Sequence, residues 1–171
     1  SRNVLRLAND TGSVSATYKL PAKNFAAKIT VGIDYAQKLS GTFMFGVKDA
    51  DGVNASYWGL GLPKRSESQM LKAGKSCINK GSGTYDYKYP EEGAYSYKVD
   101  GYTTLKMVMY LYEGTFYYFW EDGTLVGSVN ANSKCDLSKG DLSLYFANDW
   151  GRVYVQDIKI YEIIPNTFKV D

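Results

Sequence analysis

The segment from residue 104 to residue 130 most constrains the fold, because it predicts three β-strands joined by two tight turns. The turns are Glu113-Gly114 and Asp122-Gly123, and Asp followed by Gly between alternating apolar runs is a strong hairpin signal. A two-residue turn at Glu113-Gly114 places Tyr112 opposite Thr115. Because side chains alternate along a strand, this register assigns each residue of the hairpin to one of two faces.

One face of this unit is predicted to lie in the core and the other at the surface. The core face comprises Leu105, Met107, Met109, Leu111, Phe116, Tyr118, Trp120 and Leu125. The surface face comprises Lys106, Tyr110, Tyr112, Tyr117, Phe119 and Glu121. Flat aromatic rings on a rigid surface are what sugar rings stack on. We therefore expect Tyr110, Tyr112, Tyr117 and Phe119 to bind a ligand, with Lys106 as a polar neighbour, unless residues 63–103 or another domain cover this face.

The rest of the chain also alternates with a period of two, which is typical of half-buried antiparallel strands. Residues 42–62 predict a second hairpin around the turn Asp49-Ala50-Asp51-Gly52, and residues 141–147 and 152–163 predict two final strands. No segment has helical periodicity. The sequence therefore predicts an all-β protein, a two-sheet antiparallel β-sandwich of the jelly-roll type. We expect one domain over residues 1–164 and a linker stub over residues 165–171.

Composition narrows the possible functions. Histidine is absent, which removes the commonest general base and the commonest metal ligand. The net charge is +2, with 20 basic and 18 acidic residues, so neither a nucleic acid nor a membrane is an expected partner. The chain opens at Ser1, and we expect a module excised from a longer secreted protein. Cys77 and Cys135 form either one disulfide or two reduced thiols.

Four stretches of the chain, taken in order, resemble the concanavalin A-like, laminin-G-like jelly rolls of secreted bacterial polysaccharide-degrading proteins. They read VLRLANDTGSVSATYKLP, SGTFMFGVKDADGVNASYWGL, TLKMVMYLYEGTFYYFWEDGTLVGSV and LSLYFANDWGRVYVQDIKIYEI. The resemblance implies two antiparallel sheets and a noncatalytic carbohydrate-binding role beside a catalytic domain. The paired glutamates that enzymes of this fold often carry in a Glu-x-Asp-x-x-Glu pattern are absent from the chain.

Two tryptophans and a group of oxygen ligands complete the candidate sites. Trp150 is predicted to lie in a short loop between the last strands, where Asn148 and Asp149 could join it in contacting ligand. Trp58 is a further candidate whose role the sequence leaves open. By resemblance, Asp157 stands where such jelly rolls hold a structural calcium, with Asn9 and Asp10 as possible partners. The alternative for Asp157 is an aspartate at a bulge or facing water.

The leading functional hypothesis is a noncatalytic carbohydrate-binding module that targets an appended enzyme to a plant or microbial cell-wall polysaccharide. A protein-binding or adhesin module that uses the same aromatic residues is the alternative. A polysaccharide lyase that uses tyrosine with lysine or arginine is less favoured, because no spacing singles out a pair. We expect a secreted, extracellular protein that belongs to a multidomain chain, with calcium as the one candidate cofactor.

Overall fold

The computed structural model describes residues 5–20, 23–34, 41–62, 70–72, 76–79, 85–86, 96–98, 102–164 and 169–170, which form strands and turns without a helix. The strands are β1 (Leu5–Lys19), β2 (Phe25–Asp34), β3 (Gly41–Lys48), β4 (Asn54–Leu62), β5 (Met70–Lys72), β6 (Ser76–Asn79), β7 (Tyr85–Asp86), β8 (Ser96–Lys98), β9 (Tyr102–Tyr112), β10 (Thr115–Trp120), β11 (Leu125–Asn130) and β12 (Ser143–Glu162). Within these residues, no helix is long and apolar enough to cross a membrane.

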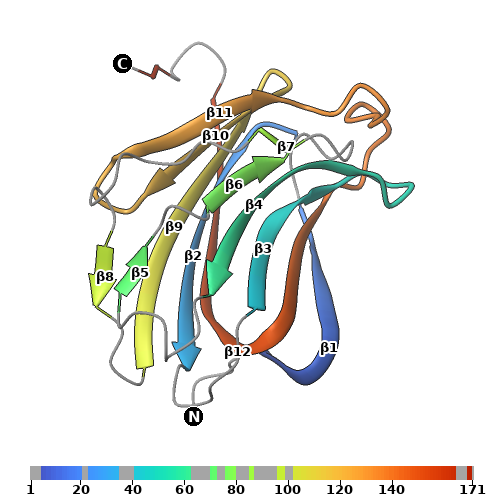
Figure 1. Ribbon diagram of the computed structural model, residues 1–171. Coiled ribbons are helices and arrows are strands. Elements are labelled where there is room, and N and C mark those ends of the chain that lie inside the picture. Colours follow the sequence, from blue (N-terminus) through green and yellow to red (C-terminus); the bar gives the residue numbers. More distant parts are fainter. Residues whose placement is uncertain are drawn as a thin grey trace.

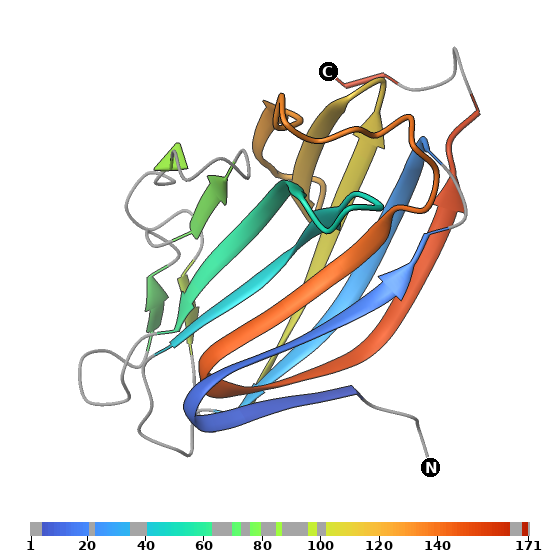
Figure 2. The ribbon, with the colours of Figure 1, turned by 90° about the vertical axis from the view of Figure 1, so that its right-hand side faces the viewer.

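The strands form two packed layers that share β12 (Figure 1). The hydrogen-bonded order is β11-β10-β9-β2-β12-β3-β4-β6-β7, with β1 along β12 and a separate β5-β8 pair. The first part of β12 pairs with β3 and its second part pairs with β2, while β1 follows it on both sides of the change. Figure 2 shows β1 and β12 bending together at one end of the molecule. The predicted two-sheet antiparallel β-sandwich is therefore confirmed.

The predicted loop at residues 148–151 is wrong, because these residues belong to β12. Asn148 pairs with Phe43 and with Val14, and Gly151 pairs with Asn9. Here β12 passes from one layer to the other while it stays paired with β1. The register of β1 shifts between Asn9 and Ser13 to accommodate this change. A bend that carries a strand from one sheet to the other needs a bulge rather than a turn.

The core lies between the two layers and is rich in aromatic side chains. Trp58 of β4 meets Trp120 of β10 edge to face, with ring centroids 4.7 Å apart. Tyr118 also packs against Trp58 at 5.9 Å, and its hydroxyl shares a 2.7 Å hydrogen bond with that of Ser56. Burial raises the pKa of Tyr118 far above its usual value, even though the hydrogen bond to Ser56 acts in the opposite direction. Trp120 is 3% exposed, which confirms its predicted place in the core.

The register predicted for the β9-β10 hairpin is confirmed pair by pair, from Tyr112 with Thr115 to Met107 with Trp120. The exception on the core face is Leu125, which is 42% exposed. Leu125 pairs with Phe119 and Gly127 pairs with Tyr118, so Val126 is an extra residue in β11. Such a bulge reverses the face on which the preceding residue lies. Leu125 therefore lies outside, beside Phe119.

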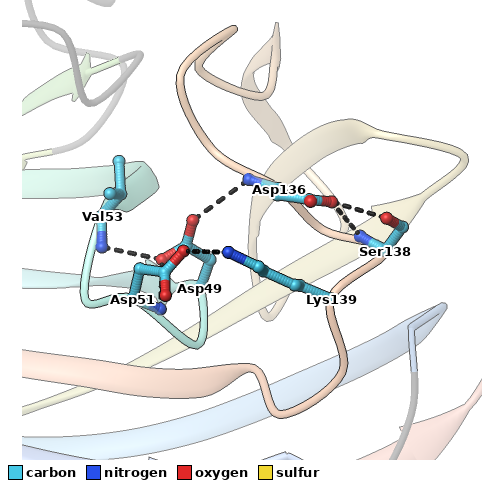
Figure 3. A network of polar contacts seen from close by, with 6 residues as sticks. All are labelled: Asp49, Asp51, Val53, Asp136, Ser138 and Lys139. Carbon is cyan, nitrogen blue, oxygen red and sulfur yellow. Dashed lines mark hydrogen bonds and ion pairs between the residues drawn. The ribbon is translucent and has the colours of Figure 1, made fainter.

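The turn between β3 and β4 anchors the loop of residues 131–142 (Figure 3). One carboxylate oxygen of Asp49 accepts hydrogen bonds from the backbone N–H groups of Asp51 and Val53, and the other accepts one from that of Asp136. Lys139 pairs with Asp51 at 2.9 Å. Burial by itself would raise the pKa of Asp49, but the three backbone donors outweigh it and the pKa is lowered.

Cys135 lies in the same loop and is a free thiol, so of the two alternatives for this cysteine the disulfide is wrong. Burial and the charge of nearby Asp49 raise the pKa of the Cys135 thiol to about 12. The side chain packs against the core cluster rather than lying in solvent. A thiol with so high a pKa is a poor nucleophile at neutral pH, because the thiolate is the reactive form.

Candidate functional site

An aromatic surface lies on the outer side of the layer that contains β9, β10 and β11. We call it the aromatic face; its members are Tyr110, Tyr112, Tyr117, Phe119, Leu125 and Tyr161. Tyr110, Tyr112, Tyr117 and Phe119 are half-buried, and Tyr161 is 50% exposed. None of the four predicted rings is fully buried, so the segments that the structure describes leave this face open to a ligand.

Cross-strand pairing arranges these side chains in rows. Tyr161 of β12 lies opposite Ala26 of β2, Ala26 opposite Tyr110, Tyr110 opposite Tyr117, and Tyr117 opposite Ser128. Neighbouring strands are about 4.8 Å apart, so the row runs straight across the layer. The short side chain of Ala26 leaves the tyrosines on either side of it as the prominent groups.

A second row continues the aromatic face one step along the strands. Val108 lies opposite Phe119, and Phe119 opposite Leu125. The rings of Tyr110 and Phe119 meet edge to face at 5.4 Å, which fixes each ring against the other. Because Val108 is only 5% exposed, it lies beneath the larger side chains and acts as the floor of this surface.

The turn at Glu113-Gly114 holds the aromatic face in register. Both turn residues have positive φ angles, 48° at Glu113 and 77° at Gly114, as a two-residue type I′ hairpin turn requires. A non-glycine residue in this region is uncommon. The side chain of Asn24 donates to the Glu113 carboxylate and accepts from the Glu113 backbone N–H, each at 3.1 Å. These two bonds tie the turn to the chain just before β2.

Charged groups border the aromatic face. The predicted polar neighbour Lys106 is exposed and forms an ion pair with Glu121 at 3.3 Å. Lys159 of β12 lies 3.7 Å from Asp157, and Lys28 of β2 is exposed on the same side. Exposed ion pairs of this kind add little to stability, but their charged ends remain available to a polar ligand.

A second tyrosine pair, which sequence analysis missed, lies on the outer side of the other layer. Tyr145 of β12 and Tyr57 of β4 are both opposite Gly46 of β3, one on each side, and the Lys48 ammonium lies 4.0 Å from the centre of the Tyr145 ring. A Cβ at Gly46 would lie 2.5 Å from the Tyr57 Cβ, so only glycine fits there. Alternation around Gly46 in the sequence indicates a strand. It does not show which other strands become the neighbours of that strand.

Two predicted ligand-binding residues lie in the interior instead. Trp58 is 0% exposed and belongs to the core cluster, because its place in β4 directs it toward β10. Asn148 is also 0% exposed, on the inner side of β12 opposite Phe43. Both assignments to a ligand site are therefore wrong. Asp149 and Trp150 lie in β12, but their side chains fall outside the described residues, and their contact with ligand stays a prediction.

The predicted calcium ligands are not brought together. Asn9 pairs with Gly151, six positions before Asp157 on β12, and at about 3.3 Å per residue this is a separation of about 20 Å. Calcium requires oxygen ligands at about 2.4 Å, so the backbone positions of Asn9 and Asp157 do not support one shared ion, and calcium binding stays a prediction. Asp157 follows a bulge and faces outward beside Lys159. The described residues contain no group of three or more His, Cys, Asp or Glu side chains that could hold a metal ion.

The fold defined by these two layers is a concanavalin A-like β-sandwich, and it is similar to that of galectins. A tetrameric galectin from the ball sponge Cinachyrella sp. is 11% identical with a TM-score of 0.58, over 86% of this chain and 99% of that chain. A toad ovary galectin in complex with thio-digalactose is 9% identical with a TM-score of 0.54, over 88% and 99%. Sheep galectin-11 is 11% identical with a TM-score of 0.54, over 90% and 100%.

The comparisons by sequence give a different result. No protein-family model matches the chain, and no curated protein matches it. The similarity to galectins is therefore one of fold.

Proposed function

We propose that this chain is a noncatalytic carbohydrate-binding module that binds a polysaccharide through the aromatic face. The observation that carries the proposal is the confirmed register of β9 and β10, which directs Tyr110, Tyr112, Tyr117 and Phe119 to one partly exposed surface. Sugar rings stack their CH groups on such rings, and charged neighbours orient the hydroxyl groups. The fold is shared with a toad galectin whose structure contains thio-digalactose, which supports a sugar as the ligand class.

A noncatalytic role is consistent with the chemistry of the chain. Without histidine, an enzyme of this fold would need another general base, and the pKa of Tyr118, a fully buried tyrosine, is raised by burial. We further propose that the module is secreted and that it targets an attached enzyme to a cell-wall polysaccharide. The support for this finer role is the resemblance of four sequence stretches to modules of polysaccharide-degrading proteins.

Affinity electrophoresis through gels that contain a panel of glucans, xylans, mannans, galactans and pectins tests the proposal. We expect retardation by at least one polymer, and binding about tenfold weaker for Tyr110→Ala, equivalent to about 1.4 kcal/mol. Tyr145→Ala, on the opposite layer, is the matched control and should bind as the parent protein does. Loss of binding in Tyr145→Ala alone would move the site to the second tyrosine pair, and no retardation by any polymer would contradict the proposal.

A protein-binding module is the second candidate, and one observation favours it. Leu125 adds an exposed aliphatic side chain beside Phe119, and contiguous apolar and aromatic surface is characteristic of protein interfaces. Pull-down with the parent protein and with Tyr110→Ala distinguishes the two candidates. Capture of one defined protein, lost in the variant, together with no binding to any glycan, would favour the protein ligand.

A further inference from the structure

Two lysines lie side by side on the outer layer, in a row that includes part of the aromatic face. Lys159 of β12 is directly opposite Lys28 of β2, and Lys28 is directly opposite Val108. Val108 lies opposite Phe119 in turn. Lys28 is thus two strands from Phe119, about 10 Å at the usual strand spacing, with the small, 5% exposed side chain of Val108 between them.

This arrangement leaves positive charge without an internal partner. Like charges that lie directly opposite each other on neighbouring strands are destabilising. Lys106 is compensated by Glu121 at 3.3 Å, and Lys159 is partly compensated by Asp157 at 3.7 Å. Lys28 forms no hydrogen bond or ion pair within the described part of the chain. On this part of the outer layer the lysines Lys28, Lys106 and Lys159 therefore outnumber the carboxylates Glu121 and Asp157.

We infer that the polysaccharide bound on the aromatic face is a polyuronate, whose sugar carboxylates are held by Lys28 and Lys159. The inference rests on the proposed function and adds the substrate class to it. A ring stacked over Tyr110 and Phe119 would cover Val108 and bring a carboxylate within reach of the flexible lysine side chains. A lysine ammonium is a compact point charge that pairs with a carboxylate without a fixed orientation.

The modest excess of charge favours a polymer with one carboxylate per sugar over a densely sulfated chain. The whole protein carries a net charge of only +2, whereas strongly charged polymers are bound by extended basic surfaces. The carboxylate also relieves the repulsion between Lys28 and Lys159, so the ligand supplies what the free protein lacks. Binding should weaken as salt is added, because exposed charges are screened within about 10 Å at 0.1 M ionic strength.

Affinity electrophoresis with three polymers tests this inference: polygalacturonate, its highly methyl-esterified form, which has the same backbone without the charge, and heparin. We expect the strongest retention by polygalacturonate. We expect Lys28→Gln and Lys159→Gln each to weaken this retention roughly two- to fivefold, the range found for exposed charge pairs. Lys134→Gln makes the same change of charge at an exposed position in the loop 131–142 and should leave retention unchanged.

The other outcomes separate the two proposals. The polyuronate would be overturned if the charged and esterified polymers were retained equally and Lys28→Gln were indistinguishable from the parent. Loss of binding in Tyr110→Ala would in that case still support carbohydrate binding on the aromatic face. Strongest retention by heparin would overturn the assignment to carboxylate. Absence of retention by every polymer in the wider panel would overturn the proposed function and the inference with it.

Discussion

The hydroxyl groups of Tyr118 and Ser56 share a 2.7 Å hydrogen bond across the interior of the sandwich, between strands of opposite layers. Each residue is 0% exposed, so each hydroxyl depends on the other. Tyr118→Phe would leave the Ser56 hydroxyl buried without this partner, and we expect it to lower the free energy of unfolding by about 1–3 kcal/mol. Urea denaturation measures the change, with the half-exposed Tyr161→Phe as a near-neutral control. The double variant with Ser56→Ala should lose less than the sum of the single variants.

The same tyrosine predicts how stability depends on high pH. The pKa of Tyr118 is raised in the folded state by burial, so its contribution is fully present below the unfolded pKa of about 10 and is lost as the pH rises above it. We expect the free energy of unfolding to fall above pH about 10 in the parent protein, and to fall less steeply in Tyr118→Phe. Equal slopes in the two proteins would contradict the assignment of this titration to Tyr118.

Gly46 should tolerate no larger residue. A Cβ at this position would clash with the Ser56 carbonyl oxygen and lie 2.5 Å from the Tyr57 Cβ. We expect Gly46→Ala to lower the free energy of unfolding by about 1–3 kcal/mol, as overpacking does. Gly52 is the contrasting control, since it has open space but a φ of +79°, and Gly52→Asn should be milder because asparagine adopts this conformation. Thermal unfolding that ranks the two variants in the opposite order would contradict the steric explanation.

Asp49 should make the protein sensitive to acid. Its folded-state pKa is lowered by backbone hydrogen bonds that outweigh burial, so its contribution is present above the unfolded pKa of about 3.9 and is lost as the pH falls through the folded pKa. We expect Asp49→Asn to be less stable at neutral pH and to show a weaker loss below pH about 4. Asp141→Asn, at an exposed ion pair with Lys19, is the control and should change stability little.

The charge of Asp49 should also control the reactivity of Cys135. Burial and this carboxylate hold the Cys135 pKa at about 12, so little thiolate exists at pH 8. In a Cys77→Ser background, we expect slow alkylation of Cys135 by iodoacetamide, and faster alkylation when Asp49→Asn removes the charge. Mass spectrometry follows the reaction. A rate that is unaffected by Asp49→Asn would mean that burial alone keeps the thiol protonated.

Leu125 should matter for ligand binding and not for folding. It is 42% exposed on the aromatic face, whereas Leu5 of β1 is 40% exposed and lies outside that face. We expect Leu125→Ser to weaken retention by the bound polymer, while Leu5→Ser leaves retention unchanged. Both variants should stay within about 0.5 kcal/mol of the parent in stability, as exposed substitutions usually do. Equal effects of the two variants on retention would mean that Leu125 does not contact the ligand.

The sequence predicts most of the fold where local rules decide the outcome. The Glu113-Gly114 turn determines its own geometry, and the register of β9 with β10 follows from it. The predicted core position of Leu125 is wrong because of the bulge at Val126. This bulge lies beyond the next turn, where nothing local requires an extra residue. The polar stretch at residues 148–151 resembles a turn, and only pairing with β1 and β3 reveals it as a bend within one strand.

The sequence predicts only part of the candidate site, because local rules decide only some of its neighbours. Tyr110 and Tyr117 lie on consecutive strands, so a single turn places them together. The row formed by Tyr161, Ala26 and Tyr110 joins strands that are remote in sequence, and neither alternation nor turn chemistry shows that β12 will lie beside β2. The sequence leaves the role of Trp58 open, because alternation gives two faces without saying which one is covered by the opposite layer.

The passage of β12 through both layers has a consequence for how the chain reaches its native state. In both layers β12, residues 143–162, pairs with β1 on one side and with β2 or β3 on the other, and it follows the other described strands in the sequence. Until this segment has been synthesised, β2 and β3 each present an unpaired edge of the kind that promotes aggregation. Among the described strands, the last to be synthesised is thus the one that joins β1 to β2 and β3, and neither layer can complete its native pairing before it is made.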